Sequence, residues 1–374
     1  MSGAINFAHT EEQSLFRDSL RKFLHAASPT SRVRQMQTTE SGFDPQLWAR
    51  MNQELALPGI AIAESQGGSG FGWVELCIAA EETGYALTPS PFFASSVMAV
   101  AVLNTIAPND PLLARLACGE VRAATALLEG PAGWQTECFT CRVNQHRAVG
   151  VKQFVIDGAT ADVLLVFAAD AEGIGLYVLE EATAVERQPL TVIDPTRRLA
   201  RVTFTGAPVR IAGTVSPAQF ERIIDLCSIA LANEMVGGIS RLFDDTLAFT
   251  RLRVQFGRTI ASFQAIKHRM AELLLQVELA RSAAYYAAQA VDAGAANLSY
   301  VASLAKSTVS DAYIFTAQEA IQLHGGIGFT WDHDTQLWFK RAKSSEVLFG
   351  TSAWHRDRMI RHLEENSVAG GKRA

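Results

Sequence analysis

Long helical patterns joined by short connections are the sequence feature that most restricts the fold. After residue 216, apolar residues recur at helical spacing in three long stretches and one short one, at about 217–254, 263–292, 299–323 and 331–341. Ser216 and Pro217 suit the first of these helices as N-cap and first-turn residue. Long helices with short connections predict an antiparallel four-helix bundle over residues 216–374. We expect its polar end, residues 364–374, to be frayed.

The chain before residue 216 changes its pattern at Gly119. Thr10 and Gln13 form a capping box that predicts a helix to about Ala26. Further helical patterns begin at Pro45 and near Trp73, and run over 92–106 and 111–118. Six short runs rich in β-branched and aromatic residues then lie between turn residues, at 123–128, 139–143, 149–156, 163–168, 175–178 and 200–204. The sequence therefore predicts an N-terminal α-helical domain (1–118), a central β-barrel or sandwich (119–215) and the bundle (216–374).

The composition excludes several classes of protein. The chain has 374 residues and a net charge of −5, so it lacks the basic excess of nucleic-acid-binding proteins. Residues 1–6 contain neither the basic nor the apolar segment of a signal peptide. No run of about 20 apolar residues predicts a membrane span. Five cysteines in a chain of this length, with Cys227 inside an apolar helical pattern, suit the reducing cytoplasm.

Two short motifs carry little chemistry. The glycine-rich stretch at 66–72 has no preceding strand and lacks the Lys, Ser or Thr that a phosphate loop needs in its next turn, so we interpret it as a flexible connector. Cys138 and Cys141 form a lone Cys-x-x-Cys pair without the further Cys or His ligands that zinc would need. Residues three apart in a strand point to opposite faces, which also argues against a redox pair. We expect no metal.

The break between the first two long helices, residues 253–264, concentrates positive charge. Gly257 can end one helix, and Ser262 can begin the next as its N-cap. Three arginines crowd this break: Arg251, Arg253 and Arg258. Cations beside a helix N-terminus make an anion site that suits a phosphate or diphosphate. The alternative is a helical hairpin whose arginines are only solvated.

Two stretches together resemble the acyl-CoA dehydrogenases, a family of flavoproteins. They are residues 253–264 and the run Gln-Leu-His-Gly-Gly-Ile-Gly-Phe-Thr at 322–330, and the resemblance extends over nearly the whole chain. It implies a tetramer whose subunits have an α domain, a β domain and a second α domain. It also implies FAD between the β domain and the C-terminal bundle, with the diphosphate and adenine reaching a neighbouring subunit.

The resemblance implies a set of cofactor contacts on the bundle side. Arg253 would contact the FAD diphosphate of the partner subunit, with Gln255 and Phe256 beside it and Phe263 nearer the adenine. Four residues of the second stretch would meet the other side of that cofactor: Gln322, Leu323, Gly325 and Gly326. Two adjacent glycines fit this role because backbone without a Cβ can approach a diphosphate closely. An ordinary helix end would also use them.

The β-domain side of the implied flavin site keeps less of the family pattern. Phe154 stands where the family often has a Trp against the flavin ring, but Ile156 replaces a Thr that would donate to the flavin. Residues 128–134, Leu-Glu-Gly-Pro-Ala-Gly-Trp, replace the family's Thr-Glu-Pro-Gly-Ala-Gly-Ser and lose its first Thr and last Ser. Thr351, after Gly350, stands where the family has a Thr near the cofactor.

The catalytic base is absent from both of its usual positions. The family removes the α-proton of an acyl-CoA thioester with a Glu, while the flavin accepts a hydride from the β-carbon. Most members have that Glu at the position of Phe349. A subset takes it from the position of Cys227, which is followed by Ser228 in place of a substrate-binding Arg. Neither Phe nor Cys can replace a carboxylate base without special activation.

Five carboxylates are candidates for a relocated base. Glu234 lies two helical turns after Cys227 on the same face, and the others are Glu346, Asp244, Asp245 and Asp332. For each of them the alternative is a solvated or ion-paired acid.

Three functions follow as hypotheses. The first is FAD-dependent α,β-dehydrogenation of an acyl-CoA, with a bulky or steroid-derived acyl group and a displaced base. The second is a subunit without its own base, paired with an active homologue as in the bacterial α2β2 enzymes that act on steroid side chains. The third is a flavin monooxygenase on the same fold, which needs no α-proton base. The resemblance implies acyl-CoA as substrate, homologous subunits in a tetramer as partners, and electron-transfer flavoprotein as acceptor.

Overall fold

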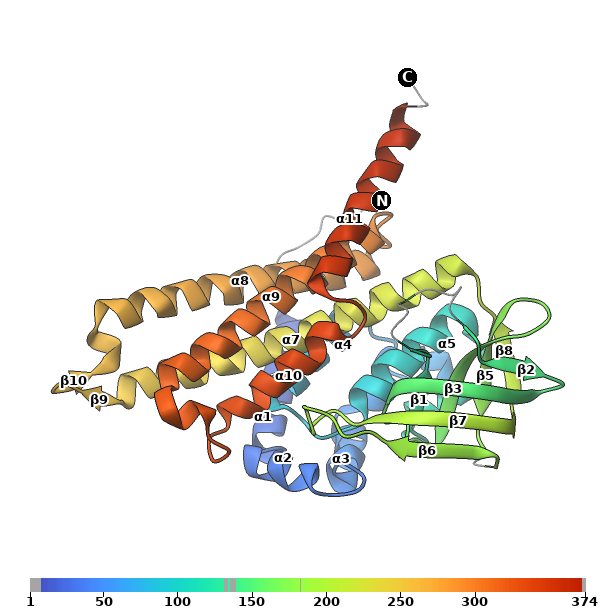
Figure 1. The fold of residues 1–374 in the computed structure, drawn as a ribbon, viewed down its shortest axis with the longest axis horizontal. Helices are drawn as coiled ribbons and strands as arrows, with labels where there is room; N and C mark the ends of the chain where they lie inside the picture. The colour runs from blue at the N-terminus through green and yellow to red at the C-terminus, as the bar shows by residue number, and fades with distance from the viewer. Residues whose placement is uncertain (1–7, 131–133, 135–138, 182, 372–374) are drawn as a thin grey trace. The chain divides into compact units, whose positions relative to one another are not determined.

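Contacts divide the computed structural model of the chain (Figure 1) into two compact units that are each discontinuous in sequence. The described residues are 8–130, 134, 139–181 and 183–371, with the backbone alone after residue 364. The helical unit comprises Met1–Val33, Cys77–Thr88 and Ser228–Ala374, and the sheet unit comprises Arg34–Leu76 and Pro89–Cys227. The division into three domains at residues 118 and 215 stays a prediction.

Helices fill the chain before the sheet, as the sequence predicts. In α1 (Glu11–Ala27) the predicted capping box is present: Gln13 N–H donates to Thr10 Oγ1 at 3.2 Å, and Thr10 N–H donates to Gln13 Oε1 at 3.0 Å. The helices that follow are α2 (Thr30–Gln37), α3 (Pro45–Leu55), α4 (Trp73–Ala86), the π-helix η3 (Phe92–Ala99), α5 (Val100–Ile106) and α6 (Leu112–Ala117), with short 3-10 turns at η1 (Leu57–Gly59) and η2 (Glu64–Gln66).

The glycine-rich stretch at 66–72 is not a loose connector. Gly70 N–H donates to Ile62 O at 2.8 Å, and Phe71 N–H donates to Ile60 O at 3.0 Å. These backbone hydrogen bonds fold the stretch back onto the chain before it. The prediction of flexibility is therefore wrong, because the glycines here allow tight packing of backbone on backbone.

The sheet unit is built on one mixed sheet. Its strands are β1 (Ala123–Ala126), β2 (Arg142–Asn144), β3 (Arg147–Ile156), β4 (Val163–Ala169), β5 (Ile174–Leu179), β6 (Val185–Pro189), β7 (Leu199–Pro208) and β8 (Arg210–Thr214). The order is β6-β7-β3-β2-β4-β5-β8, and β1 pairs in parallel with β4. Its core contains Val166, Tyr177 and Phe204, each no more than 2% exposed.

The predicted central β-barrel is wrong in one respect, because the described strands do not close. The strands β6 and β8 each pair on one side only and form the two edges of an open sheet. Both edges are largely exposed, and β6 is polar and ends at Pro189, features that protect an edge from further pairing. The polarity of β6 explains why the sequence pattern missed that strand.

In the helical unit, α4 and α7 (Pro217–Leu252) cross with their backbones in contact. A Cβ added at Gly237 would stand 1.9 Å from Glu81 O, and one added at Gly84 would stand 2.0 Å from Glu234 O. Only glycine permits this approach. The crossing fixes the backbone of Glu234, one of the five candidate bases.

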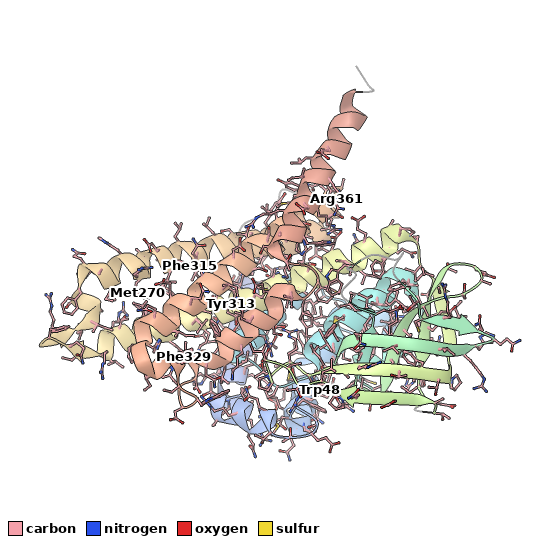
Figure 2. The ribbon with its side chains drawn as sticks, viewed as in Figure 1. Trp48, Met270, Tyr313, Phe315, Phe329 and Arg361 are labelled. Carbon is pink, nitrogen blue, oxygen red and sulfur yellow. The ribbon has the colours of Figure 1, made fainter. Side chains whose placement is uncertain are left out.

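Four further helices follow α7, and the predicted C-terminal helical region is confirmed. They are α8 (Gln264–Asp292), α9 (Leu298–His324), α10 (Thr335–Val347) and α11 (Ser352–Gly371), and α9 contacts the other three. Tyr313 of α9 is fully buried, whereas Phe329, after α9, is 82% exposed; both are labelled in Figure 2. The sequence pattern missed α11, which extends to Gly371 and so past the start of the tail predicted from residue 364.

One element bears on the question of a membrane. By length and composition α7 could span a bilayer, but its most apolar window is wholly buried within the protein. A core helix of a globular protein has the same character.

Candidate cofactor-binding and active site

The break after α7 is a β-hairpin. The strands β9 (Val254–Gln255) and β10 (Arg258–Thr259) pair antiparallel around Phe256 and Gly257, whose φ angles of 54° and 77° fit a two-residue turn with both φ positive. The prediction that Gly257 ends a helix is therefore wrong, because this residue forms part of the hairpin turn.

The predicted N-cap of α8 is also wrong. Phe263 occupies the N-cap position without a side-chain hydrogen bond, after the short 3-10 turn η5 (Ile260–Ser262). Ser262 Oγ instead donates to Thr259 O at 2.7 Å, because η5 turns it away from the helix start.

The hairpin presents its predicted cofactor contacts to the surface. The backbone of Arg253 is fixed at both ends: its N–H donates to Phe249 O, and its carbonyl accepts from Ile260 N–H, each at 2.8 Å. The side chains of Arg253, Gln255 and Phe256 are exposed, Phe256 to 91%. Phe263 is half-buried, with the Arg258 guanidinium 4.1 Å from its ring centroid and the Phe256 ring edge-on at 6.2 Å. The result is an exposed cationic and aromatic surface.

The second motif forms the turn that ends α9. Gly325 has φ 66° and ψ −149°, a conformation almost confined to glycine, and its N–H donates to carbonyls of the last helical turn, so it is also the C-cap. A Cβ added at Gly325 or Gly326 would meet no atom within 4 Å. Gln322 is exposed and Leu323 is half-buried. The 3-10 turn η6 (Gly325–Phe329) then leads the chain away.

A buried histidine joins the two motifs. The ring of His324 stacks on that of Phe249, with centroids 4.3 Å apart, and its Nδ1 lies 2.7 Å from Ala320 O. Burial lowers the pKa of His324, and the neighbouring His333 acts in the same direction. Phe249 binds Arg253 through its carbonyl, and His324 precedes Gly325. The structure therefore places both predicted motifs at one end of the helical unit, which we call the open end (252–264 and 322–329).

The usual position of the base lies in a closed turn. Phe349 is 2% exposed and has φ 55°, and Gly350 follows with φ 107°. A Cβ at Gly350 would stand 2.4 Å from the Trp354 ring. Thr351 is exposed, and its Oγ1 accepts from Trp354 N–H at 3.3 Å, as an N-cap of α11 would. Residues 348–351, the closed turn, thus bury a phenyl ring at the position where the resemblance implies a carboxylate.

The alternative position of the base is equally unsuitable. Cys227 is 1% exposed, and burial raises the pKa of its thiol to about 12, with Asp225 acting in the same direction. A thiol with that pKa stays protonated near neutral pH and cannot accept a proton. The next residue, Ser228, is fully buried.

Glu234 is engaged in an ion pair. Its carboxylate accepts from Arg341 Nη1 at 2.6 Å, and both side chains are at most 10% exposed. With its backbone locked at the α4–α7 crossing, Glu234 has the surroundings of a structural residue. The sequence could not reveal this, because Arg341 lies on α10, 107 residues away.

The other candidate acids have partners or lie at the surface. Asp244 accepts from Tyr85 OH at 2.9 Å, and Asp245 accepts from Arg241 Nε at 2.7 Å. Glu346 is half-buried and pairs with Lys343 at 3.2 Å, and Asp332 is exposed. None of these positions combines burial with an open approach for substrate.

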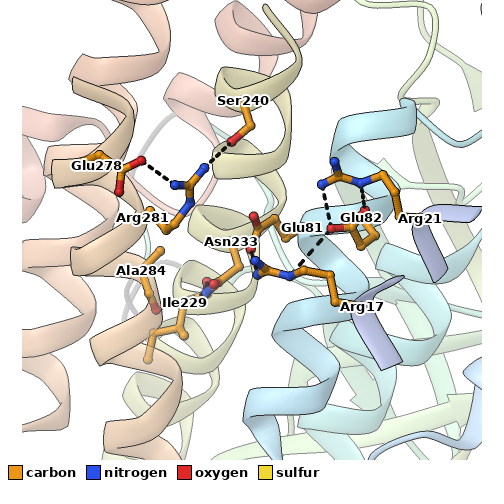
Figure 3. A network of polar contacts seen from close by, with 10 residues as sticks. All are labelled: Arg17, Arg21, Glu81, Glu82, Ile229, Asn233, Ser240, Glu278, Arg281 and Ala284. Carbon is orange, nitrogen blue, oxygen red and sulfur yellow. Dashed lines mark hydrogen bonds and ion pairs between the residues drawn. The ribbon is translucent and has the colours of Figure 1, made fainter. Parts of the chain in front are cut away.

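Asp244 also lines a cleft of about 400 Å³ between helices of the helical unit. Figure 3 shows how its charges pair with one another: Arg17 with Glu81 at 2.5 Å, Arg21 with Glu82, and Arg281 with Glu278 at 2.5 Å. Because these partners bind one another, most of the charged side chains at this cleft are already paired within the protein.

In the sheet unit, the predicted flavin-side residues lie at an irregularity of β3. The register of β3 against β7 shifts between Lys152 and Val155, which is a β-bulge. Phe154 lies in the bulge with φ 54° and is 47% exposed, whereas Ile156 is buried. An exposed aromatic ring suits contact with a planar ligand, and Ile156 adds no side-chain donor.

Sequence reasoning missed a buried ion pair beside this bulge. Lys152 is fully buried, and its Nζ donates to Glu129 Oε1 at 2.7 Å and to Leu127 O at 3.1 Å. Burial alone would raise the pKa of Glu129, but Lys152 and hydrogen bonds from Thr140 outweigh it and lower that pKa. The pair became apparent only from the fold, because the backbone bond from Gln153 N–H to Leu128 O joins the two segments.

The Cys-x-x-Cys pair is only half described. Cys138 and residues 131–133 lie outside the described residues. Cys141 is buried, and burial raises the pKa of its thiol to about 11. Among the described residues no group of three or more His, Cys, Asp or Glu side chains could hold a metal ion.

Three phenylalanines at the predicted site share one unusual backbone conformation. The φ angles of Phe154, Phe256 and Phe349 are 54°, 54° and 55°. Bulky residues rarely adopt positive φ, and such outliers concentrate at functional sites. Each of the three stands where the resemblance puts a contact with flavin or substrate.

Comparison with known proteins gives these positions their context. Two family models match: acyl-CoA dehydrogenase, N-terminal domain, over residues 10–109, and acyl-CoA dehydrogenase, C-terminal domain, over residues 221–364. Acyl-CoA dehydrogenase IpdE2 of Mycolicibacterium smegmatis is 33% identical over 341 residues, which are 91% of this chain and 95% of that protein. The chain belongs to the acyl-CoA dehydrogenase family.

Two further acyl-CoA dehydrogenases are similar over almost the whole chain. Acyl-CoA dehydrogenase FadE34 of Mycobacterium tuberculosis is 34% identical over 373 residues, which are 97% of this chain and 49% of FadE34. A solved structure of a variant of the Tcur3481-Tcur3483 steroid ACAD has a TM-score of 0.86 and 26% identity, and the match covers 96% of this chain and 99% of that one. The family and fold predicted from the two motifs are confirmed, and the family comprises oxidoreductases that act on CH–CH groups.

Within the acyl-CoA dehydrogenase frame the two parts of the predicted site differ. The open end offers exposed cations, aromatic rings and backbone without Cβ atoms, which are the groups that a dinucleotide cofactor needs. The closed turn and Cys227 offer no proton acceptor. The open end thus has the groups that an anion site uses, whereas neither Phe349 nor Cys227 can accept an α-proton.

Proposed function

We propose that the chain is a subunit of a flavin-dependent acyl-CoA dehydrogenase whose catalytic carboxylate comes from a homologous partner chain. The single observation that carries this proposal is the burial of both usual base positions. Phe349 is 2% exposed and Cys227 is 1% exposed, and the pKa of Cys227 is raised to about 12 by burial. A group that cannot reach substrate or accept a proton cannot start the reaction.

The open end supports a retained role in binding FAD. Arg253 would hold the diphosphate of a cofactor shared with the partner, and Gly325 and Gly326 would let the backbone approach it, since added Cβ atoms there would point into open space. Phe256 would lie beside the diphosphate, and Phe263 would lie nearer the adenine. When bound, FAD supplies the hydride acceptor of the reaction. This chain's own contribution is to bind and orient that cofactor.

The remaining residues of the predicted site have narrower roles in the proposal. Phe154 would face the flavin ring, and Thr351 would stand near the cofactor, while Gln255, Gln322 and Leu323 would border the diphosphate. Electron-transfer flavoprotein as acceptor and a cytoplasmic location remain expectations from the family.

Two relatives support pairing with a second homologous unit. The steroid ACAD with 26% identity has a name that joins two designations, Tcur3481 and Tcur3483, as a protein made of two different chains would. The match to FadE34 spans 49% of that protein, which leaves length for a second unit of this size. By analogy we propose a heteromeric assembly and a bulky, steroid-derived acyl group as substrate.

The visible spectrum of the chain purified alone, with its mass by light scattering, is the decisive measurement. We expect little FAD and no anaerobic bleaching with short, long, cyclic or steroid side-chain acyl-CoAs. Co-expression with a homologous chain that carries the usual Glu should yield an α2β2 complex with bound FAD that bleaches. As a control, replacing that Glu by Gln in the partner should abolish bleaching without loss of FAD.

Two outcomes would replace the proposal. A homotetramer of this chain with one bleachable FAD per subunit would make it a self-sufficient dehydrogenase with a relocated base, and the carboxylates Glu234 and Glu346 would be the first to test. Oxygen uptake by the reduced flavin without acyl-CoA bleaching would point to a monooxygenase.

A further inference from the structure

A buried lysine in the middle of α9 contacts the closed turn. Lys306 is fully buried in the helical unit. Its Nζ donates to Ser310 Oγ at 2.9 Å, to Gly350 O at 3.2 Å and to Glu346 O at 3.3 Å. A buried ammonium group is costly unless such acceptors surround it, so the site is built for the lysine. These contacts join α9 to the end of α10 and to the closed turn.

The two carbonyl groups that Lys306 binds lie at the end of α10 and beside the left-handed backbone of Phe349. Glu346 O belongs to the last turn of α10, where carbonyl groups have no partner within the helix and a cation is favourable. Gly350 O follows the left-handed Phe349 at φ 55°. Ser352 Oγ adds a bond at 3.4 Å to Ser307 O, the residue next to Lys306. Strained backbone persists only where its surroundings hold it.

We propose that Lys306 is a positioning residue for the closed turn. By binding the carbonyls of Glu346 and Gly350, it holds the ring of Phe349 in the base position and sets where Thr351 stands relative to the cofactor. This inference rests on the proposed function, in which Thr351 borders FAD. It goes beyond that function by assigning a role to a side chain that touches neither cofactor nor substrate.

The test compares Lys306→Met with Ser310→Ala. The first variant removes both carbonyl contacts, whereas the second removes only the hydroxyl partner and leaves the turn bound. Hydrogen exchange followed by mass spectrometry should show exchange over residues 347–355 about tenfold faster in Lys306→Met and unchanged in Ser310→Ala. The FAD affinity of the assembled enzyme should fall by a similar factor in Lys306→Met and stay unchanged in Ser310→Ala. Both affinities are measured well below the melting temperature of either variant.

Several results would overturn the proposal. Exchange that rises equally throughout the helical unit would mean a general structural role, and an opened turn with wild-type FAD affinity would remove the link to the cofactor. If Lys306→Met does not fold, Lys306→Gln decides, because its uncharged side chain is one bond shorter and cannot bind both carbonyls as the ammonium group does. Faster exchange confined to the turn supports the proposal, and wild-type exchange contradicts it.

Failure of the proposed function would be recognised separately. A wild-type chain that takes up no FAD, alone or with a homologous partner, would end that function whatever Lys306 does. The exchange comparison needs no flavin and would still decide whether Lys306 fixes the turn.

Discussion

Phe256 and Phe349 have the same backbone conformation and opposite surroundings. Their φ angles are 54° and 55°, yet Phe256 is 91% exposed at the tip of the β9–β10 hairpin and Phe349 is 2% exposed in the closed turn. An exposed strained aromatic residue lowers the energy of the isolated chain little, so its position is best explained by something that binds it. A buried one contributes packing energy to the fold itself.

The difference separates two parts of one inherited site. At the open end the groups that would hold a cofactor remain accessible, with Arg253 exposed and Gly325 unobstructed. At the closed turn, the position where the resemblance implies a catalytic Glu holds a buried core residue, Phe349. A chain can lose the base and keep the cofactor contacts if a partner shares that cofactor, which is the asymmetry that the proposed heteromer requires.

The largest change in stability is expected for Glu234, and it tests whether this residue is structural or catalytic. We expect Glu234→Gln to lower the free energy of unfolding by about 3–5 kcal/mol, because Arg341 would be left as a buried charge without its carboxylate. Urea denaturation followed by circular dichroism measures this loss. Activity of the assembled enzyme, per folded molecule, should be unchanged.

A matched control makes the Glu234 result specific. Glu346→Gln disrupts only a half-exposed pair with Lys343 and should change stability by less than about 0.5 kcal/mol. The double variant Glu234→Gln, Arg341→Met should recover most of the lost stability. Loss of activity with normal stability in Glu234→Gln would instead identify a working base and remove the contrast between the two parts of the site.

The two phenylalanines provide the next test. Phe349→Ala should cost about 3 kcal/mol of stability, since it leaves a cavity in a packed core. Phe256→Ala should cost less than about 0.5 kcal/mol in the chain alone but weaken FAD binding and assembly. Thermal melting and light scattering of both variants test the pair. Equal stability losses would show that Phe256 is also a core residue of the folded chain.

Sequence reasoning worked where local pattern and short motifs decide structure. The long helices, the capping box at Thr10 and the Ser216 cap, whose Oγ accepts from Gln219 N–H at 3.2 Å, follow from spacing and side-chain chemistry within a few residues. It failed where tertiary contacts decide. The open edge β8, the Glu234–Arg341 pair and the contacts of Lys306 each join segments far apart in the chain. The hairpin at Gly257 is local, and there the two-residue turn was misread as a helix end.

For the site, the sequence located positions but not their surroundings. The resemblance implied a Glu at the position of Phe349, but it could not indicate that the Phe349 ring is buried, since burial depends on packing of the whole helical unit. It likewise indicated Arg253 as a cofactor contact without indicating the hairpin that exposes it. Whether these residues contact FAD stays a prediction.

Arg253→Ala tests the open end directly. Loss of a charge-assisted contact to a diphosphate should weaken FAD binding by about 1.5–3 kcal/mol, with little effect on folding because the side chain is exposed. Fluorescence titration of the assembled apoenzyme with FAD measures the change. Arg251→Ala is the control, an exposed arginine two residues away without a predicted cofactor contact. Equal effects of the two variants would indicate only a general attraction by positive charge.

The smallest expected effect is a pH dependence confined to the closed turn. His355 is fully buried beneath this turn, and burial lowers its pKa from 6.5 to about 3, with Lys306 and Arg358 acting in the same direction. Between these values the unfolded chain binds a proton that the folded chain does not, so stability falls as the pH drops below 6.5. The loss should reach roughly 2 kcal/mol by about pH 5.

Urea unfolding at several pH values tests this dependence. The free energy of unfolding should fall less steeply with decreasing pH in His355→Gln than in the wild type. It should fall as in the wild type in His268→Gln, which alters an exposed histidine on α8. An unchanged slope in His355→Gln would mean that the closed turn admits water, and the contrast with the open end would then rest on Phe349 alone.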